Sequence, residues 1–288
     1  MSRLRRIALF AACLSLLPAC AWAAPVAIVA AENFYGDVAR QIGGGDVTVS
    51  SILQSPDQDP HLFEAAPSTA RDIAAARILV QSGIGYDDWM AKLAQASNGG
   101  AAKLLVVAPL AARRNGDNPH IWYDPQTMLA YAAVLSERLA AADPAHAADF
   151  RRRLADFQAS MHPVLAKIAA LRAQHSGTPV TATEPVFGYL MDAVGLRNRN
   201  AAFQVAVMND TEPSASDLAA FEQSLKTRAV KLLVYNSQAT DPLADRMKTL
   251  ARQSGVPVLP VTETEPPGTT YQAWMLDALN KLQQALAQ

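Results

Sequence analysis

The chain has 288 residues, enough for two domains of ordinary size or for one large α/β domain. Half of the residues are hydrophobic and 18 % are charged, so we expect a chain that is globular throughout, with sizeable cores. The formal net charge is −1 and no block of basic residues is present, which argues against nucleic acid as a partner.

Residues 1–23 have the layout of a secretory signal peptide. Three arginines within the first six residues precede an apolar run, Ile7 to Leu17, and Ala21-Trp22-Ala23 supplies a small-residue cleavage site. The apolar run is too short to cross a bilayer. We therefore expect an exported, periplasmic protein. A stretch that resembles a lipoprotein box ends at Cys20, so a lipid anchor through that cysteine is the alternative.

After the signal peptide, short apolar runs alternate with longer amphipathic stretches. Buried strands are predicted at 25–31, 47–53, 77–83 and 103–109, with helices at 33–44, 69–76 and 86–97. The alternation resumes after residue 178, with strands at 179–183, 231–237 and 256–262 and helices at 187–195, 214–228 and 241–255. This order is typical of parallel sheets with helices on their faces, so we expect two α/β lobes.

Between these lobes lies a stretch, 143–177, in which apolar residues recur at helical spacing. Asp143-Pro144 is a suitable helix start, and Pro163 is the one expected kink. A helix of about 30 residues would be about 45 Å long, which exceeds the usual connection in a compact fold. We therefore predict a long linker helix that joins an N-terminal lobe, 24–142, to a C-terminal lobe, 178–288.

Four side chains are candidates for one binding site. His61 in DQDPHLFE and His120 in NPHIWYDP each follow a proline at a turn beside the N-terminal lobe. Glu184 and Glu263 each lie where a predicted strand of the C-terminal lobe ends. Ligands of open α/β sheets bind outside the carboxyl ends of the strands, so these four residues are predicted to converge on a cleft.

The motifs resemble those of the periplasmic metal-binding receptors of zinc- and manganese-uptake ABC transporters, the cluster A-I solute-binding proteins. The resemblance covers the mature chain and rests on AENFYGDVARQIGG, DPHLFE, SGIGYDDWMAKL, NPHIWYDP, TEPVFGYL, EPSASDL and VTETEPPGTTYQAWM. It implies that His61 and His120 are histidine ligands, that Glu184 is the third ligand and that Glu263 is a fourth, carboxylate ligand. It also implies a membrane permease of an ABC transporter as the partner.

The chain departs from the family pattern at several positions. Glu263 stands where aspartate is usual, and the adjacent Glu265 is left open as the alternative fourth ligand. Asn236 stands where many members have glutamate. Asn236 and Gln238 could either support the ligands or cap the strand. The segment 110–118 lacks the histidine-rich loop of many zinc-type members.

The donor types indicate a divalent transition metal as the cargo. Imidazole suits Zn²⁺, carboxylate also suits Mn²⁺, and both cysteines, Cys13 and Cys20, lie in the signal peptide. Monodentate carboxylates would give a tetrahedral site suited to Zn²⁺, whereas bidentate carboxylates would give the six donors that Mn²⁺ accepts. Glutamate at the third position resembles the manganese-type members, but the sequence leaves Zn²⁺ or Mn²⁺ open.

The predicted function is therefore metal capture and delivery by a monomeric receptor, not catalysis. A secreted zinc hydrolase is the alternative from another class, but four protein ligands would close the position that a catalytic zinc keeps open. The chain has no HExxH, GxSxG or GxxxxGK[ST] signature of an enzyme. A surface adhesin of the same fold is a third alternative.

The remaining histidines and the aromatic residues near the motifs are expected to be structural. His146, His162 and His175 fall on or at the end of the linker, where solvated or packed side chains are the ordinary case. Trp122, Tyr123 and Phe187 are expected to form the cleft wall or the core.

Overall fold

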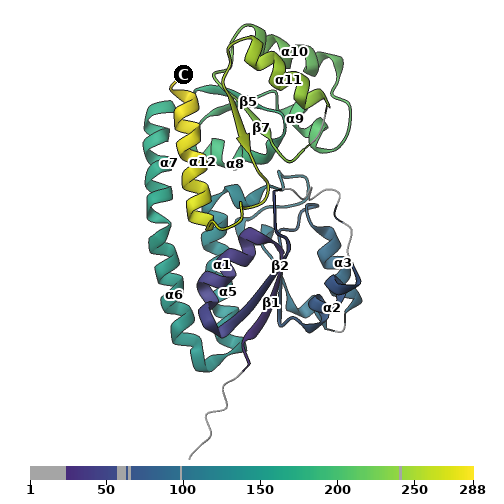
Figure 1. Cartoon of the computed structure of the whole chain (residues 1–288), viewed down its shortest axis with the longest axis vertical. Coiled ribbons are helices and arrows are strands. Elements are labelled where there is room, and N and C mark those ends of the chain that lie inside the picture. Colours follow the sequence, from purple (N-terminus) through teal and green to yellow (C-terminus); the bar gives the residue numbers. More distant parts are fainter. Residues whose placement is uncertain (1–23, 57–62, 64–65, 98, 240–241) are drawn as a thin grey trace, which may run out of the picture.

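The computed structural model describes residues 24–56, 63, 66–97, 99–239 and 242–288, which form two α/β lobes beside a helical strut (Figure 1). Each lobe is built on a four-stranded parallel sheet. The parallel arrangement in both lobes is as the sequence predicts, whereas the C-terminal sheet has one strand more than the three predicted. Among the described residues, no helix is long and apolar enough to cross a membrane.

The sheet of the N-terminal lobe has the strand order β2-β1-β3-β4. Its strands are β1 (Val26–Glu32), β2 (Val47–Leu53), β3 (Ile78–Gln81) and β4 (Leu104–Val106). Its helices are α1 (Asn33–Gly43), α2 (Pro67–Ala75), α3 (Asp88–Ala96), α4 (Gly100–Lys103) and α5 (Pro125–Ala142). The two central strands are almost continuously buried, which is why they read as unbroken apolar runs.

The sheet of the C-terminal lobe has the order β6-β5-β7-β8. Its strands are β5 (Pro179–Ala182), β6 (Arg197–Arg199), β7 (Leu233–Asn236) and β8 (Val258–Val261). Its helices are α8 (Gly188–Val194), α9 (Ala201–Met208), α10 (Ala215–Lys226), α11 (Pro242–Gln253) and α12 (Tyr271–Leu286). The edge strand β6 is absent from the predicted set because its sequence, Arg-Asn-Arg, is polar and its side chains are largely exposed.

The strut consists of α6 (Ala147–Ser160) and α7 (His162–His175), which run end to end alongside both lobes (Figure 1). The helix is interrupted at Met161, two residues before Pro163, where we expect the kink. Proline has no N–H to donate to the preceding turn. Helix α12 packs along α7, and Lys167 on α7 donates to Gln283 on α12 at 2.6 Å.

Short 3₁₀ turns connect several of the described helices and strands. They are η1 (Gly44–Asp46), η3 (Ala108–Ala111), η4 (Ile121–Tyr123), η5 (Pro144–His146) and η6 (Pro185–Phe187). The loops that carry η4 and η6 come from different lobes, and Tyr123 and Phe187 pack edge to face across the boundary, with ring centroids 5.0 Å apart. One hydrophobic core therefore extends through both lobes and the strut.

Candidate metal site

The loop before η4 presents His120 to the lobe boundary, where the side chain is completely buried. Its Nδ1 lies 2.7 Å from Oδ1 of Asn118, and Nδ2 of Asn118 donates to the Pro185 carbonyl of the other lobe at 2.7 Å. The bond to Pro185 orients the amide so that its oxygen faces the imidazole. An amide oxygen can only accept, so Nδ1 carries the proton and the lone pair of Nε2 is available to a metal.

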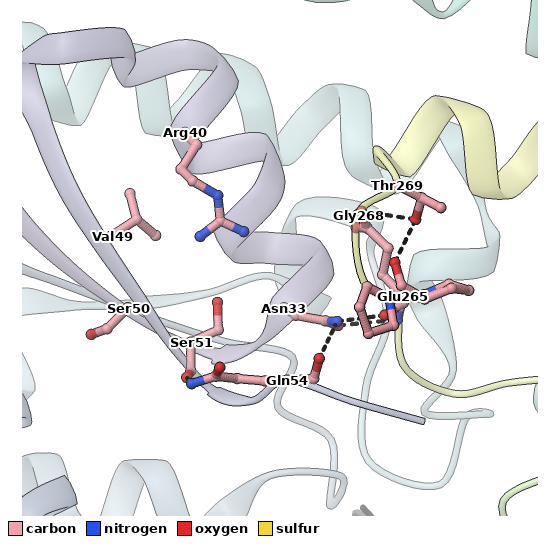
Figure 2. A pocket seen from close by; sticks show the side chains of 11 residues that line it. Asn33, Arg40, Val49, Ser50, Ser51, Gln54, Glu265, Gly268 and Thr269 are labelled. Atoms are coloured by element: carbon pink, nitrogen blue, oxygen red, sulfur yellow. Dashed lines mark hydrogen bonds between the residues drawn. The ribbon is translucent and has the colours of Figure 1, made fainter. Parts of the chain in front are cut away.

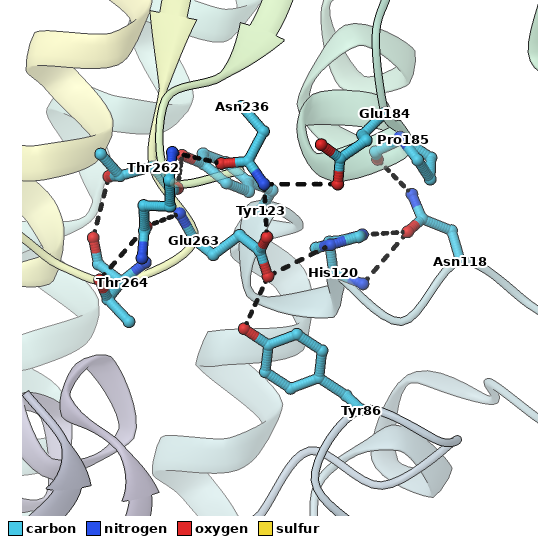
Figure 3. A network of polar contacts seen from close by, with 11 residues as sticks. Tyr86, Asn118, His120, Tyr123, Glu184, Pro185, Asn236, Thr262, Glu263 and Thr264 are labelled. Atoms are coloured by element: carbon cyan, nitrogen blue, oxygen red, sulfur yellow. Dashed lines mark hydrogen bonds and ion pairs between the residues drawn. The ribbon is translucent and has the colours of Figure 1, made fainter. Parts of the chain in front are cut away.

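Glu263 follows β8 and is also completely buried, directly opposite His120 (Figure 3). Its Oε2 lies 3.6 Å from Nε2 of His120 and accepts a hydrogen bond from the Tyr86 hydroxyl at 2.9 Å. Burial, and then the charge of Glu263, raises the pKa of Tyr86 well above its usual value, so the phenol remains the donor. The carboxylate of the C-terminal lobe is thus held by residues of the N-terminal lobe.

Glu184 follows β5, where it starts η6, and only 4 % of its surface is exposed. The Nδ2 of Asn236, at the end of β7, lies 3.4 Å from Oε2 of Glu184 and donates to Oε1 of Glu263 at 2.6 Å. Figure 3 shows the Asn236 amide between the two carboxylates. The strand-end positions of the C-terminal sheet therefore meet in a single polar network, as the placement of parallel strand ends predicts.

The structure brings together three of the four predicted ligands, His120, Glu184 and Glu263. His61 lies outside the described residues, and its role stays a prediction. Within the described part of the chain, no group of three or more His, Cys, Asp and Glu side chains is arranged to hold a metal ion. Instead, the side-chain amide of Asn236 stands between Glu184 and Glu263.

Glu265, the alternative fourth ligand, faces a different part of the lobe boundary. It lines a polar cavity of about 350 Å³ together with Asn33 and Arg40 (Figure 2). The side chain of Asn33 on α1 holds the backbone of Glu265 through two hydrogen bonds. Oδ1 of Asn33 accepts from the Glu265 N–H at 3.0 Å, and Nδ2 of Asn33 donates to the Glu265 carbonyl at 2.6 Å. Burial, and then the charge of Asp37, raises the pKa of Glu265 to about 9. The geometry therefore favours Glu263 as the residue that shares a site with His120.

A second pair of buried carboxyl groups lies in the N-terminal lobe and is not among the sequence candidates. Glu32 ends β1, and Asp87 accepts the backbone N–H groups of Ser82 and Gly83 at 2.6 and 2.7 Å. Burial raises the pKa of Asp87 to about 7. Burial, and then the charge of Asp87, raises the pKa of Glu32 well above its usual value. Glu32 could have been found by the strand-end rule that selects Glu184.

The residues expected to be structural lie apart from the network of Glu263 or pack around it. His162 and His175 belong to α7, and His146 lies in η5 with its Nδ1 2.6 Å from Asp143. Trp122, Tyr123 and Phe187 are fully buried in the shared core, as expected. The rings of Trp122 and His120 are 5.3 Å apart, so Trp122 forms part of the apolar wall behind the imidazole.

Comparison with known proteins places the chain in a family. The sequence profile of the family described as zinc-uptake complex component A, periplasmic, matches residues 28–285. The chain belongs to this family. The iron ABC transporter substrate-binding lipoprotein MtsA of Streptococcus pyogenes serotype M1 is 23 % identical over 284 residues, which cover 90 % of this chain and 88 % of MtsA. A putative metal-binding protein of Treponema pallidum is 23 % identical over 318 residues, which cover 99 % of this chain and 97 % of that protein.

Solved structures share the same fold. The periplasmic zinc-binding protein TroA from Treponema pallidum superposes with a TM-score of 0.76 at 18 % identity, covering 92 % of this chain and 100 % of TroA. A manganese-bound periplasmic metal-binding protein from Candidatus Liberibacter asiaticus gives a TM-score of 0.72 at 18 % identity, covering 91 % of this chain and 99 % of that protein. The two-lobe architecture is therefore that of known metal-binding proteins.

Proposed function

We propose that this protein is an extracytoplasmic receptor that binds a divalent transition metal, Zn²⁺ or Mn²⁺, at the lobe boundary and delivers it to an ABC permease. The observation that carries the proposal is the buried His120, whose Nε2 lone pair faces the carboxylate of Glu263. Burying an imidazole against a carboxylate without a hydrogen bond at Nε2 is costly, and a metal ion between them would remove that cost. Membership of the zinc-uptake family supports the same interpretation.

The proposed ligands are His61, His120, Glu184 and Glu263. Two donors about 2.1 Å from one Zn²⁺ at the tetrahedral angle are about 3.4 Å apart, by the geometry of zinc sites. The observed distance of 3.6 Å between Nε2 of His120 and Oε2 of Glu263 is close to that value. Little movement of this pair is therefore needed when a metal arrives. A metal bound here would join the lobes, because His120 and Glu263 come from different ones.

The same geometry favours transport over catalysis. With four protein ligands the coordination sphere of a zinc ion would be full, so no position would remain for an activated water. We therefore propose that the protein is not an enzyme, and neither a secreted hydrolase nor an adhesin is supported by the family. A monomer in the periplasm, either soluble or anchored through Cys20, completes the proposal. The homologue of Streptococcus pyogenes is itself named a lipoprotein.

Thermal unfolding of the metal-free mature protein tests this function. A ligand present at about 1,000 times its Kd stabilises the folded state by about 4 kcal/mol, so Zn²⁺ and Mn²⁺ should raise the Tm clearly and Ca²⁺ should not. Glu184→Gln should reduce the shift. The matched control is Glu222→Gln, which removes a partly exposed carboxylate of the same lobe from its pairing with Lys226 and Arg246. If neither Zn²⁺ nor Mn²⁺ raises the Tm of the wild type, the receptor function is refuted.

A further inference from the structure

Asn236 is the residue through which Glu184 and Glu263 are connected. Its Nδ2 donates to Oε1 of Glu263 at 2.6 Å and lies 3.4 Å from Oε2 of Glu184. Its Oδ1 accepts the N–H of Gln238 at 3.0 Å, which orients the amide so that the NH₂ group faces the carboxylates. The Asn236 amide is buried and its direction is determined by the backbone. It therefore presents donors, not acceptors, to the proposed site.

The two oxygens of Glu263 have different surroundings as a result. Oε2 faces His120 and the Tyr86 hydroxyl, whereas Oε1 accepts the short bond from Asn236. A metal between the lobes meets Oε2 first. To take Oε1 as well, it would have to compete with an amide donor that is buried, and an unpaired buried donor costs more than the bond itself contributes. The network thus favours binding through one oxygen.

The backbone around Glu263 resists a rearrangement that would free Oε1. The side-chain oxygen of Gln238 accepts the N–H of Thr264 at 3.0 Å and also the N–H of Glu263. On the other side, the Tyr123 hydroxyl donates to the Thr262 carbonyl at 2.7 Å. The segment that carries Glu263 is therefore held at three successive residues, and its backbone cannot move the carboxylate away from Asn236 without breaking these contacts.

We infer that Asn236 is a positioning residue that restricts Glu263 to monodentate binding and thereby makes the site select Zn²⁺ over Mn²⁺. The inference rests on the proposed function and deepens it. Carboxylates that each bind through one oxygen keep the number of donors close to the four that Zn²⁺ prefers, whereas Mn²⁺ favours a larger set of oxygen donors. The 3.4 Å contact between Nδ2 of Asn236 and Oε2 of Glu184 favours monodentate binding by Glu184 in the same way.

Metal competition with Asn236→Leu tests this inference, because leucine has a similar volume and no donor. Loss of a supporting hydrogen bond typically lowers metal affinity roughly 10- to 100-fold. We expect that loss for Zn²⁺, while Mn²⁺ gains access to Oε1 and keeps its affinity, so the Zn²⁺/Mn²⁺ affinity ratio should fall at least about tenfold. The matched control is Asn198→Leu, which removes another side-chain amide of the C-terminal lobe, one that among the described residues bonds with Gln204 alone. Its ratio should equal that of the wild type.

The absorption spectrum of bound Co²⁺ would not change if Asn236 had a purely structural role, so it provides an independent test. Four-coordinate Co²⁺ absorbs strongly in the visible range and six-coordinate Co²⁺ weakly, so geometry can be read directly. The wild type and Asn198→Leu should give the strong bands, and Asn236→Leu or Asn236→Ala should give weak ones. Unchanged bands and an unchanged metal ratio in a folded Asn236 variant would overturn the inference.

The wild-type protein alone also decides part of the question, so a variant that does not fold cannot leave the inference untested. Weak Co²⁺ bands in a wild type that binds Zn²⁺ and Mn²⁺ would overturn the role of Asn236 and leave the receptor function intact. A wild type that binds neither metal would overturn the proposed function itself, and this result is visible before any variant is made.

Discussion

Asn118→Ala is the sharpest test of how the two lobes prepare His120 for metal. The substitution removes three contacts of one amide: Oδ1 with the His120 N–H at 3.2 Å, Oδ1 with Nδ1 at 2.7 Å and Nδ2 with the Pro185 carbonyl at 2.7 Å. At about 1 kcal/mol each, these bonds contribute about 2–3 kcal/mol to the stability of the metal-free protein. Without the Asn118 oxygen, the ring proton can move to Nε2, where it would bond to Glu263 and compete with metal.

We therefore expect Asn118→Ala to weaken Zn²⁺ binding roughly 10- to 100-fold, or about 1.4–2.7 kcal/mol. Chelator competition measures the affinity, and urea unfolding of the metal-free protein measures the stability. Asn118→Asp separates the two effects, because a carboxylate still accepts from Nδ1 but cannot donate to Pro185. It should lose stability and keep metal affinity. The reasoning fails if Asn118→Ala binds Zn²⁺ as the wild type does, or if Asn118→Asp loses as much affinity as Asn118→Ala.

Two further predictions concern carboxyl groups with raised pKa values. Folding raises the pKa of Asp87 from 3.8 to about 7, so the folded protein binds a proton that the unfolded chain releases, and stability should fall as pH rises across this window. Glu32→Gln replaces one acid of the pair with a neutral donor and should flatten this fall in urea unfolding between pH 5 and 8; equal slopes would show that the pair is not responsible. Glu265→Gln should leave Zn²⁺ affinity unchanged, whereas Glu263→Gln should abolish tight binding. A loss of affinity in Glu265→Gln would make Glu265 the ligand.

The sequence predicts the fold well where strands are buried on both faces. The runs at β1 and β3 are apolar because helices cover both sides of the sheet, and such runs are visible without a structure. The polar edge strand β6 carries no such signal. The break between α6 and α7 is predictable because the effect of Pro163 is local. What the sequence reveals is thus set by burial and by local backbone chemistry.

The candidate site is predictable only in part, for a related reason. Strand ends and Pro-His turns can be located along the chain, which is how His120, Glu184 and Glu263 are found. The choice between Glu263 and Glu265 depends on the path of an irregular loop, which Gln238 and Asn33 determine from distant parts of the chain. Contacts of that kind have no periodicity. The same holds for Tyr86, whose hydroxyl reaches Glu263 from the other lobe.

The contacts between the lobes also limit how the protein can open for metal. The Tyr271 hydroxyl donates to the Trp122 carbonyl at 2.7 Å, and the Tyr123 hydroxyl donates to the Thr262 carbonyl at 2.7 Å. The core that these residues share is continuous across the boundary, so a wide hinge motion would break buried hydrogen bonds and expose packed aromatic rings. The strut of α6 and α7 runs along both lobes and opposes the same motion (Figure 1). Metal capture should therefore proceed by local rearrangement of loops, and a permease would distinguish the loaded receptor by the order of those loops and not by the angle between the lobes.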